Sequence, residues 1–162
     1  MASAKRVSAR SSLSAGILAY RHGNHGLEVL LVHPGGPFWR NKDAGAWSIP
    51  KGEIGPAEDP EHAARREFAE ELGQGASIGP LQPLGEVLQR DGKRVIAFGG
   101  EGAFDPASLS SNSFEIEWPP RSGRVQSFPE IDRAEWFDLE TAKTKLLSGQ
   151  AEFIDRITKA RR

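Results

Sequence analysis

Short apolar runs, separated by glycine and proline, fill the first third of the chain. Residues 14–21 and 27–33 are rich in β-forming side chains, and the segment between them contains two glycines, so this pattern predicts a β-hairpin. Residues 34–37 read Pro-Gly-Gly-Pro and form a loop, because two prolines and two glycines cannot sustain a strand ladder. Residues 46–50 are predicted to form a further short strand.

A helical period begins near residue 60. Asp59 is a good N-cap, Pro60 suits the first helical position, and Gly73 supplies a C-terminal stop, so the predicted helix runs from about residue 60 to 72. Its apolar residues recur every four positions and predict a buried stripe. They are Ala64, Phe68 and Leu72.

Strands predominate again after this helix, and two helices end the chain. Four strands are predicted at residues 84–89, 94–99, 114–118 and 135–139, the first two joined by a turn at Asp91-Gly92. The apolar spacing predicts helices at residues 139–148 and 152–159. Strands interleaved with a few helices indicate the α/β class, with a mixed sheet covered by helices on both faces.

The composition limits the possible functions. A chain of 162 residues has the size of one domain. Residues 1–12 are small, polar and basic, and predict a flexible lead to a single domain at residues 13–162. The net charge of −1 gives no basic field, so nucleic acid and membranes are not expected partners. The chain has no cysteine, which excludes disulfides and zinc–thiolate sites and fits a cytoplasmic location.

Three glutamates occupy one side of the predicted helix. Glu67, Glu70 and Glu71 stand at positions i, i+3 and i+4, where like charges repel each other. A solvated face with an ordinary Arg66–Glu70 ion pair is one interpretation. The other is a site for a divalent cation, and oxygen ligands without histidine or cysteine favour Mg²⁺, with Mn²⁺ also possible.

The surrounding spacing favours the second interpretation. From residue 52 to residue 73 the chain resembles the signature of the Nudix hydrolases and matches every fixed polar and glycine position. One position departs, because Gln74 stands where the family has an aliphatic residue. Residues 47–52 also look like the usual lead-in of the family, and Glu130 stands where many members carry a further acid. The matched positions are Gly52, Glu58, Arg66, Glu67, Glu70, Glu71 and Gly73.

The resemblance implies an α/β/α sandwich with a mixed central sheet and a Mg²⁺-dependent attack of water on phosphorus. It makes Glu70 and Glu71 the leading metal ligands, and Glu67 either a ligand or the base that activates water. The backbone carbonyl of Lys51 is a further expected ligand. Glu130 is either a base or an additional ligand, the alternative being a solvated loop acid.

Other residues are assigned to structure or to the substrate. Glu58 and Arg66 are expected to brace the signature loop against the helix, with Gly52 and Gly73 supplying backbone conformations that other residues disfavour. For the substrate, the expected phosphate contact is the side chain of Lys51. Weaker candidates for substrate contacts are Arg40, Lys42, Trp118 and Arg121.

The expected substrate contains a pyrophosphate bond, as the resemblance implies. A nucleoside polyphosphate or dinucleoside polyphosphate is the first hypothesis. ADP-ribose, a nucleotide sugar or the 5′ end of RNA is the second, since the group attached to the diphosphate is recognised outside the signature. The third hypothesis belongs to another class of protein, a nucleotide-binding module without catalysis.

Overall fold

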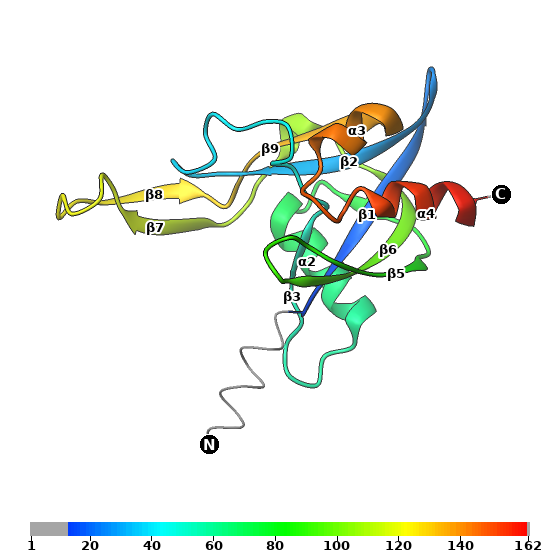
Figure 1. The fold of residues 1–162 in the computed structure, drawn as a ribbon, viewed down its shortest axis with the longest axis horizontal. Helices are drawn as coiled ribbons and strands as arrows, with labels where there is room; N and C mark the ends of the chain where they lie inside the picture. Colours follow the sequence, from blue (N-terminus) through cyan, green and yellow to red (C-terminus); the bar gives the residue numbers. More distant parts are fainter. Residues whose placement is uncertain (1–12, 162) are drawn as a thin grey trace.

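The computed structural model describes residues 13–161, so the lead predicted at residues 1–12 lies outside the described residues. The described chain forms a curled mixed sheet with helices on both faces (Figure 1). The sheet has the order β4-β6-β1-β2-β9, with β3 also paired to β1 and β5 to β6. Its strands are β1 (Leu13–Gly23), β2 (Gly26–Pro34), β3 (Lys51–Glu53), β4 (Ser77–Ile78), β5 (Gln82–Leu88), β6 (Arg94–Ala103) and β9 (Ile131–Asp138).

The central strand, β1, organises the sheet. It runs parallel to β6 and antiparallel to two other strands, which share its opposite edge. Tyr20–Gly23 pair with β2, while Ser14–Gly16 pair with β3. β2 and β3 thus pair with different parts of the same edge of β1, and residues 35–50 connect the two strands.

The strand predicted at residues 46–50 is wrong. The segment forms only isolated bridges, Val32 with Ser48 and Trp47 with Leu146, and the strand β3 begins one residue later, at Lys51. Trp47 and Ser48 bond to different neighbours, and Pro50 has no N–H to donate, so no continuous ladder forms.

The helix α2 (Pro60–Leu72) covers one face of the sheet. Its bounds confirm the prediction: the Asp59 side chain accepts from the His62 N–H, and the Gly73 N–H donates to the Ala69 carbonyl. The predicted apolar stripe is buried against sheet residues such as Ile17 and Leu30, so the last turn of α2 is held at a fixed height above the sheet.

The helices α3 (Leu139–Lys145) and α4 (Glu152–Ala160) cover the other face. The helix α3 is shorter than predicted because Leu146 is extended and the chain then pairs with Trp47. The two covered faces confirm the α/β class and the layered arrangement. No helix within residues 13–161 has the length and apolar character needed to cross a bilayer.

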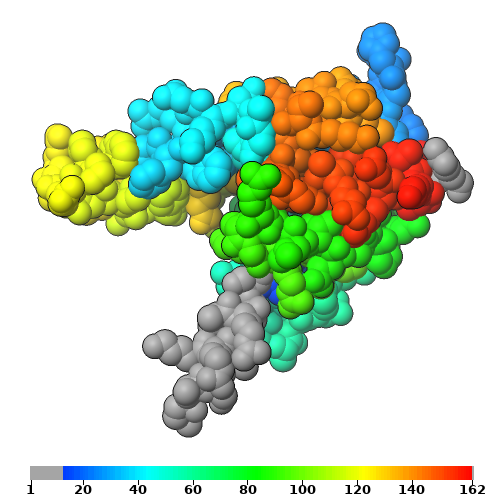
Figure 2. Space-filling model, in the orientation of Figure 1, coloured from blue at the N-terminus to red at the C-terminus, as the bar shows by residue number. Residues whose placement is uncertain are grey.

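A second, two-stranded sheet extends from the body of the molecule (Figures 1 and 2). It consists of β7 (Ser113–Glu117), close to the strand predicted at 114–118, and of β8 (Val125–Pro129), which the sequence analysis did not predict. The short strand β4 and the 3₁₀ helix at Pro106–Ser108 were not predicted either. The last strand, β9, begins before the predicted 135–139 because it pairs with most of β2.

Candidate active site

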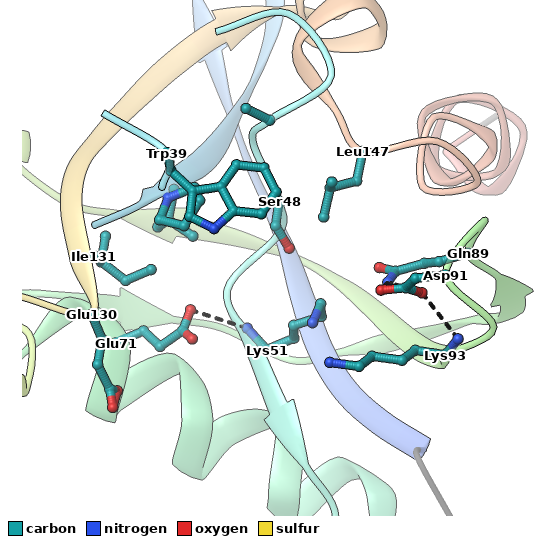
Figure 3. Close-up of a pocket in the computed structure, with 13 residues that line it drawn as sticks. Trp39, Ser48, Lys51, Glu71, Gln89, Asp91, Lys93, Glu130, Ile131 and Leu147 are labelled. Carbon is teal, nitrogen blue, oxygen red and sulfur yellow. Dashed lines mark hydrogen bonds between the residues drawn. The ribbon is translucent and has the colours of Figure 1, made fainter. Parts of the chain in front are cut away.

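A cavity of about 270 Å³ opens where α2, the chain before β3 and the turn between β5 and β6 meet (Figure 3). Glu71 and Glu130 line one end, and Gln89, Asp91 and Lys93 line the other, with Lys51 between them. The remaining lining residues come from four segments. They are Val32, Pro34, Trp39, Ala46, Ser48, Ile131 and Leu147.

Glu71 is the carboxylate that enters the cavity from α2. Its Oε1 accepts from the backbone N–H of Lys51 at 3.2 Å, and Figure 3 shows the side chain pointing toward that strand. Burial raises the pKa of Glu71 to about 8, opposed by the hydrogen bond and charge of Lys51 and assisted by the charges of Glu67 and Glu130. Because burial disfavours the ionised form of Glu71, a cation bound beside it would stabilise the carboxylate.

Glu67 lies directly against the strand β3. A Cβ atom on Gly52 would fall 2.0 Å from the carboxylate carbon of Glu67, so only glycine permits this approach. Burial raises the pKa of Glu67, the hydrogen bond from Arg66 lowers it, and the charges of Glu70 and Glu130 raise it. The expectation that Gly52 supplies a backbone conformation disfavoured by other residues is wrong, because its φ is not positive, and the close approach of Glu67 explains the glycine instead.

Arg66 joins the signature loop to α2. Its guanidinium donates two hydrogen bonds to Glu58, at 2.8 and 2.9 Å, and one to the carbonyl of Glu53 at 3.2 Å. Glu58 in turn accepts from the N–H of Gly55 at 2.8 Å. Arg66 and then Gly55 lower the pKa of Glu58 to about 2, and the pKa of Arg66 is raised. The structure brings Glu58 and Arg66 together as the sequence analysis expected.

The third glutamate of the signature points elsewhere. Glu70 is exposed, and its carboxylate lies 3.4 Å from Nη1 of Arg66, the same nitrogen that donates to Glu67 at 2.7 Å. Within residues 13–161, no three carboxylate or histidine side chains surround a common point in a way that would hold a metal ion. The guanidinium of Arg66 therefore contacts the carboxylates of both Glu67 and Glu70 and compensates their negative charges.

The donor set nevertheless has the chemistry of a hard-cation site. After burial, the charge of Glu130 contributes to the raised pKa of both Glu67 and Glu71, and all three side chains offer only oxygen. A divalent cation would relieve this repulsion, whereas histidine and cysteine ligands for softer metals are absent from these positions.

Two lysines provide positive charge in the same cavity. Figure 3 shows the side chains of Lys51 and Lys93 extending toward each other from β3 and from the turn after β5. Burial lowers the pKa of Lys51, the charge of Glu71 raises it and the charge of Lys93 lowers it. Among residues 13–161, no carboxylate forms an ion pair with either ammonium group. The two charges repel each other and would be stabilised by an anion.

The weaker substrate candidates lie outside the cavity lining. Trp118 and Arg121 belong to the hairpin of β7 and β8, where Trp118 packs on Phe38 with ring centroids 5.3 Å apart. The ammonium group of Lys42 lies over the ring of Trp39, 5.3 Å from its centroid, and Arg40 is exposed in the same loop. Their contacts with substrate stay predictions.

Most of the lining residues were not assigned to the site by the sequence analysis, among them Trp39, Gln89, Asp91 and Lys93. Asp91 was recognised only as part of a turn, and its carboxylate accepts from the N–H of Lys93 at 3.0 Å. The strong turn signal was the one available clue, and it does not reveal which cavity the turn borders.

Comparison with known proteins agrees with this geometry. The family model described as NUDIX domain matches residues 11–157, whereas no curated protein matches the chain. An Ap4A hydrolase of C. elegans, in a binary complex, superposes with a TM-score of 0.61 at 21% identity, covering 91% of this chain and 97% of that one.

Two further solved structures have the same fold. The NUDIX domain of Shewanella oneidensis NrtR, complexed with ADP ribose, has a TM-score of 0.59 at 17% identity, covering 93% of this chain and 88% of that chain. A MutT protein from Methanosarcina mazei Go1 has a TM-score of 0.55 at 21% identity, with 93% and 94% covered. The family match over most of the chain, together with the signature helix and its cavity, shows that this protein belongs to the Nudix family of pyrophosphohydrolases.

Proposed function

We propose that this protein is a Mg²⁺-dependent hydrolase, also served by Mn²⁺, that cleaves a pyrophosphate bond in a nucleoside polyphosphate or dinucleoside polyphosphate. The observation that supports it is the distribution of charge in the cavity: Glu71 and Glu130 lie at one end, Lys93 lies beside Asp91 at the other, and Lys51 lies between them. Carboxylates suit a hard cation, and ammonium groups suit the phosphates that the cation does not cover.

Each signature carboxylate has a role in this proposal. Glu70 and Glu71 would hold the metal, with Glu67 and the Lys51 carbonyl as further ligands. When bound, the metal neutralises phosphate charge and lowers the pKa of a bound water. Glu67 or Glu130 accepts the proton of the attacking water, since both line or adjoin the cavity and both interact with Glu71. To hold the cation, Glu67 and Glu70 would give up their contacts with Arg66.

The two lysines favour a polyphosphate over a simple diphosphate. A diphosphate that lies against the metal carboxylates would leave Asp91 as the anion nearest to Lys93 in the cavity, whereas a third phosphate would extend toward this lysine. The C. elegans neighbour is an Ap4A hydrolase, which makes Ap4A a reasonable first substrate. The indole of Trp39, which also lines the cavity, offers an apolar surface to a base.

The second candidate is ADP-ribose or a nucleotide sugar, because the Shewanella domain was crystallised with ADP ribose. RNA 5′ ends are less favoured by the net charge of −1. A nucleotide-like small molecule is thus the proposed partner, and a cytoplasmic location stays a prediction. A nucleotide-binding module without catalysis is the remaining alternative.

The test is hydrolysis of a panel with Mg²⁺ or Mn²⁺: Ap4A, nucleoside triphosphates, ADP-ribose, nucleotide sugars and 5′-triphosphate RNA. We expect turnover of a polyphosphate, and its loss by a factor of at least about 100 in Glu71→Gln. Glu61→Gln is the matched control, because Glu61 lies in the first turn of the same helix and contacts only Arg65. Metal binding without turnover of any substrate would support the module instead.

A further inference from the structure

The cavity adjoins a pair of buried amide side chains, Gln89 and Gln150, and neither has a role in the proposed reaction. Gln150 is fully buried and Gln89 is 5% exposed, although neither carries charge nor belongs to the signature. Gln150 lies in the short segment between α3 and α4, and Gln89 follows β5. Buried amides are costly unless they are hydrogen-bonded, so their partners show what they hold in place.

Gln150 contacts both walls of the cavity. Its Oε1 accepts from the backbone N–H of Ile49 at 3.0 Å, two residues before Lys51. Its Nε2 donates to the hydroxyl of Ser48 at 3.1 Å and to Oε1 of Gln89 at 2.6 Å. One side chain thus connects the chain that carries Lys51 to the end of β5.

The orientation of the two amides follows from their partners. The N–H of Ile49 can only donate, so the oxygen of Gln150 faces it and the nitrogen faces Gln89. Gln89 must then present its own nitrogen to Asp91, which accepts at 3.2 Å. Asp91 also accepts from the N–H of Lys93, so the series of hydrogen bonds ends at the turn that carries this lysine.

The backbone around Gln150 is fixed as well. Its N–H donates to the Leu147 carbonyl at 3.0 Å, and its carbonyl accepts from Phe153 at 2.9 Å. Gly149 has φ +97°, and a Cβ atom there would fall 2.6 Å from the Leu88 carbonyl. The segment before α4 therefore packs closely against the end of β5, so that a shift of this segment would also displace the turn between β5 and β6.

We propose that Gln150, through Gln89, is a positioning residue that sets the separation of Lys51 and Lys93 for binding the distal phosphates of the substrate. This inference rests on the proposed function and adds a determinant of substrate binding. Gln150 forms no hydrogen bond with the carboxylates of α2 and reaches Glu71 only through the chain from Ile49 to Lys51, so we expect binding to be affected more than the chemical step. Without Gln150, the chain that carries Lys51 and the turn that carries Lys93 lose the side-chain link between them.

The test uses Gln150→Leu, Gln89→Leu and the double variant. Ile157→Val serves as a stability control, because Ile157 is buried on α4 in the same core and its aliphatic side chain takes no part in the hydrogen bonds of the amide pair. Calorimetry with inorganic tripolyphosphate in EDTA measures anion binding without metal. Steady-state kinetics with Ap4A and Mg²⁺ measure KM and kcat separately, and thermal melts report stability.

We expect Gln150→Leu and the double variant to bind tripolyphosphate about tenfold more weakly and to show a similar rise in KM, with kcat within about threefold of the wild type. Ile157→Val should lower Tm and leave binding and KM unchanged. Unchanged KM in Gln150→Leu, or a rise that Ile157→Val reproduces, overturns the proposal. If the wild-type protein hydrolyses Ap4A and Gln150→Leu binds tripolyphosphate normally, this inference alone is refuted. A wild type that neither binds tripolyphosphate nor hydrolyses any polyphosphate refutes the proposed function with it.

Discussion

Gly52→Ala should separate activity from stability. The added Cβ would lie 2.0 Å from the carboxylate carbon of Glu67 and 2.1 Å from its Oε1, whereas ordinary contact begins at about 3.4 Å. Glu67 must therefore move by roughly 1 Å or more, and a displacement of this size at a catalytic group costs on the order of 100-fold in rate.

The backbone should accept the same substitution. Gly52 is not among the glycines with positive φ, so alanine adopts its conformation without strain. Alanine also reduces the conformational entropy of the unfolded chain, worth about 0.4–1 kcal/mol, which offsets part of the cost of moving Glu67. We expect Tm to change by only a few degrees.

The assay is Mg²⁺-dependent hydrolysis of the best substrate of the panel, with thermal unfolding followed by circular dichroism. Gly79→Ala is the matched control, since its Cβ would approach only the Glu101 carbonyl, at 3.4 Å, and its φ is not positive. If Gly52→Ala kept activity within about threefold of the wild type, Glu67 would not need its observed position, and the reasoning from close approach would be refuted.

Three further predictions follow from the described contacts. Arg66→Lys should lower kcat by about tenfold or more while the circular dichroism spectrum stays native. One ammonium group cannot reproduce the paired hydrogen bonds to Glu58 together with the bond to the Glu53 carbonyl. Full activity of this variant would contradict the bracing role of Arg66. Since the pKa of Glu58 is lowered to about 2 in the folded state from an ordinary value of 4.5, its stabilising contribution is present above pH 4.5 and is lost as the pH falls toward 2. Urea unfolding should thus show Glu58→Gln less stable than the wild type at pH 7, with the difference shrinking below pH 4.5; a constant difference would contradict this. Lys93→Ala should raise KM for Ap4A by about tenfold and for ADP-ribose by less than about threefold, whereas equal effects on both would remove the evidence for a distal phosphate site.

Local signals were sufficient for the helix that carries the carboxylates. Asp59, Pro60 and Gly73 act within their own turns of chain, so a cap, a proline and a stop can be recognised without knowledge of the fold. The Glu58–Arg66 pair was also predictable, because its members are fixed positions of one signature. Helix α2 and this contact both appear where the sequence placed them.

Long-range contacts explain what the sequence could not predict. Ser48 bonds to β2 and Trp47 to the chain after α3, which prevents the strand expected there. Gln150 acquires its position from hydrogen bonds to Gln89 and to the N–H of Ile49, 61 and 101 residues away, and Lys93 is linked to it only through Gln89 and the turn. Nothing in the local pattern distinguishes such a lysine or glutamine from one on the surface. The roles assigned to the signature carboxylates stay predictions until they are measured.

The walls of the cavity are drawn from positions between Val32 and Leu147, nearly the whole described chain. A graft that moved only the signature segment into a foreign scaffold would transfer the acids and their arginine, but not the opposing lysine or the indole. Such a chimera should bind manganese while failing to retain a long anionic substrate. Under the proposed function, substrate recognition would therefore depend on the assembled tertiary structure and would not be transferred with the signature segment alone.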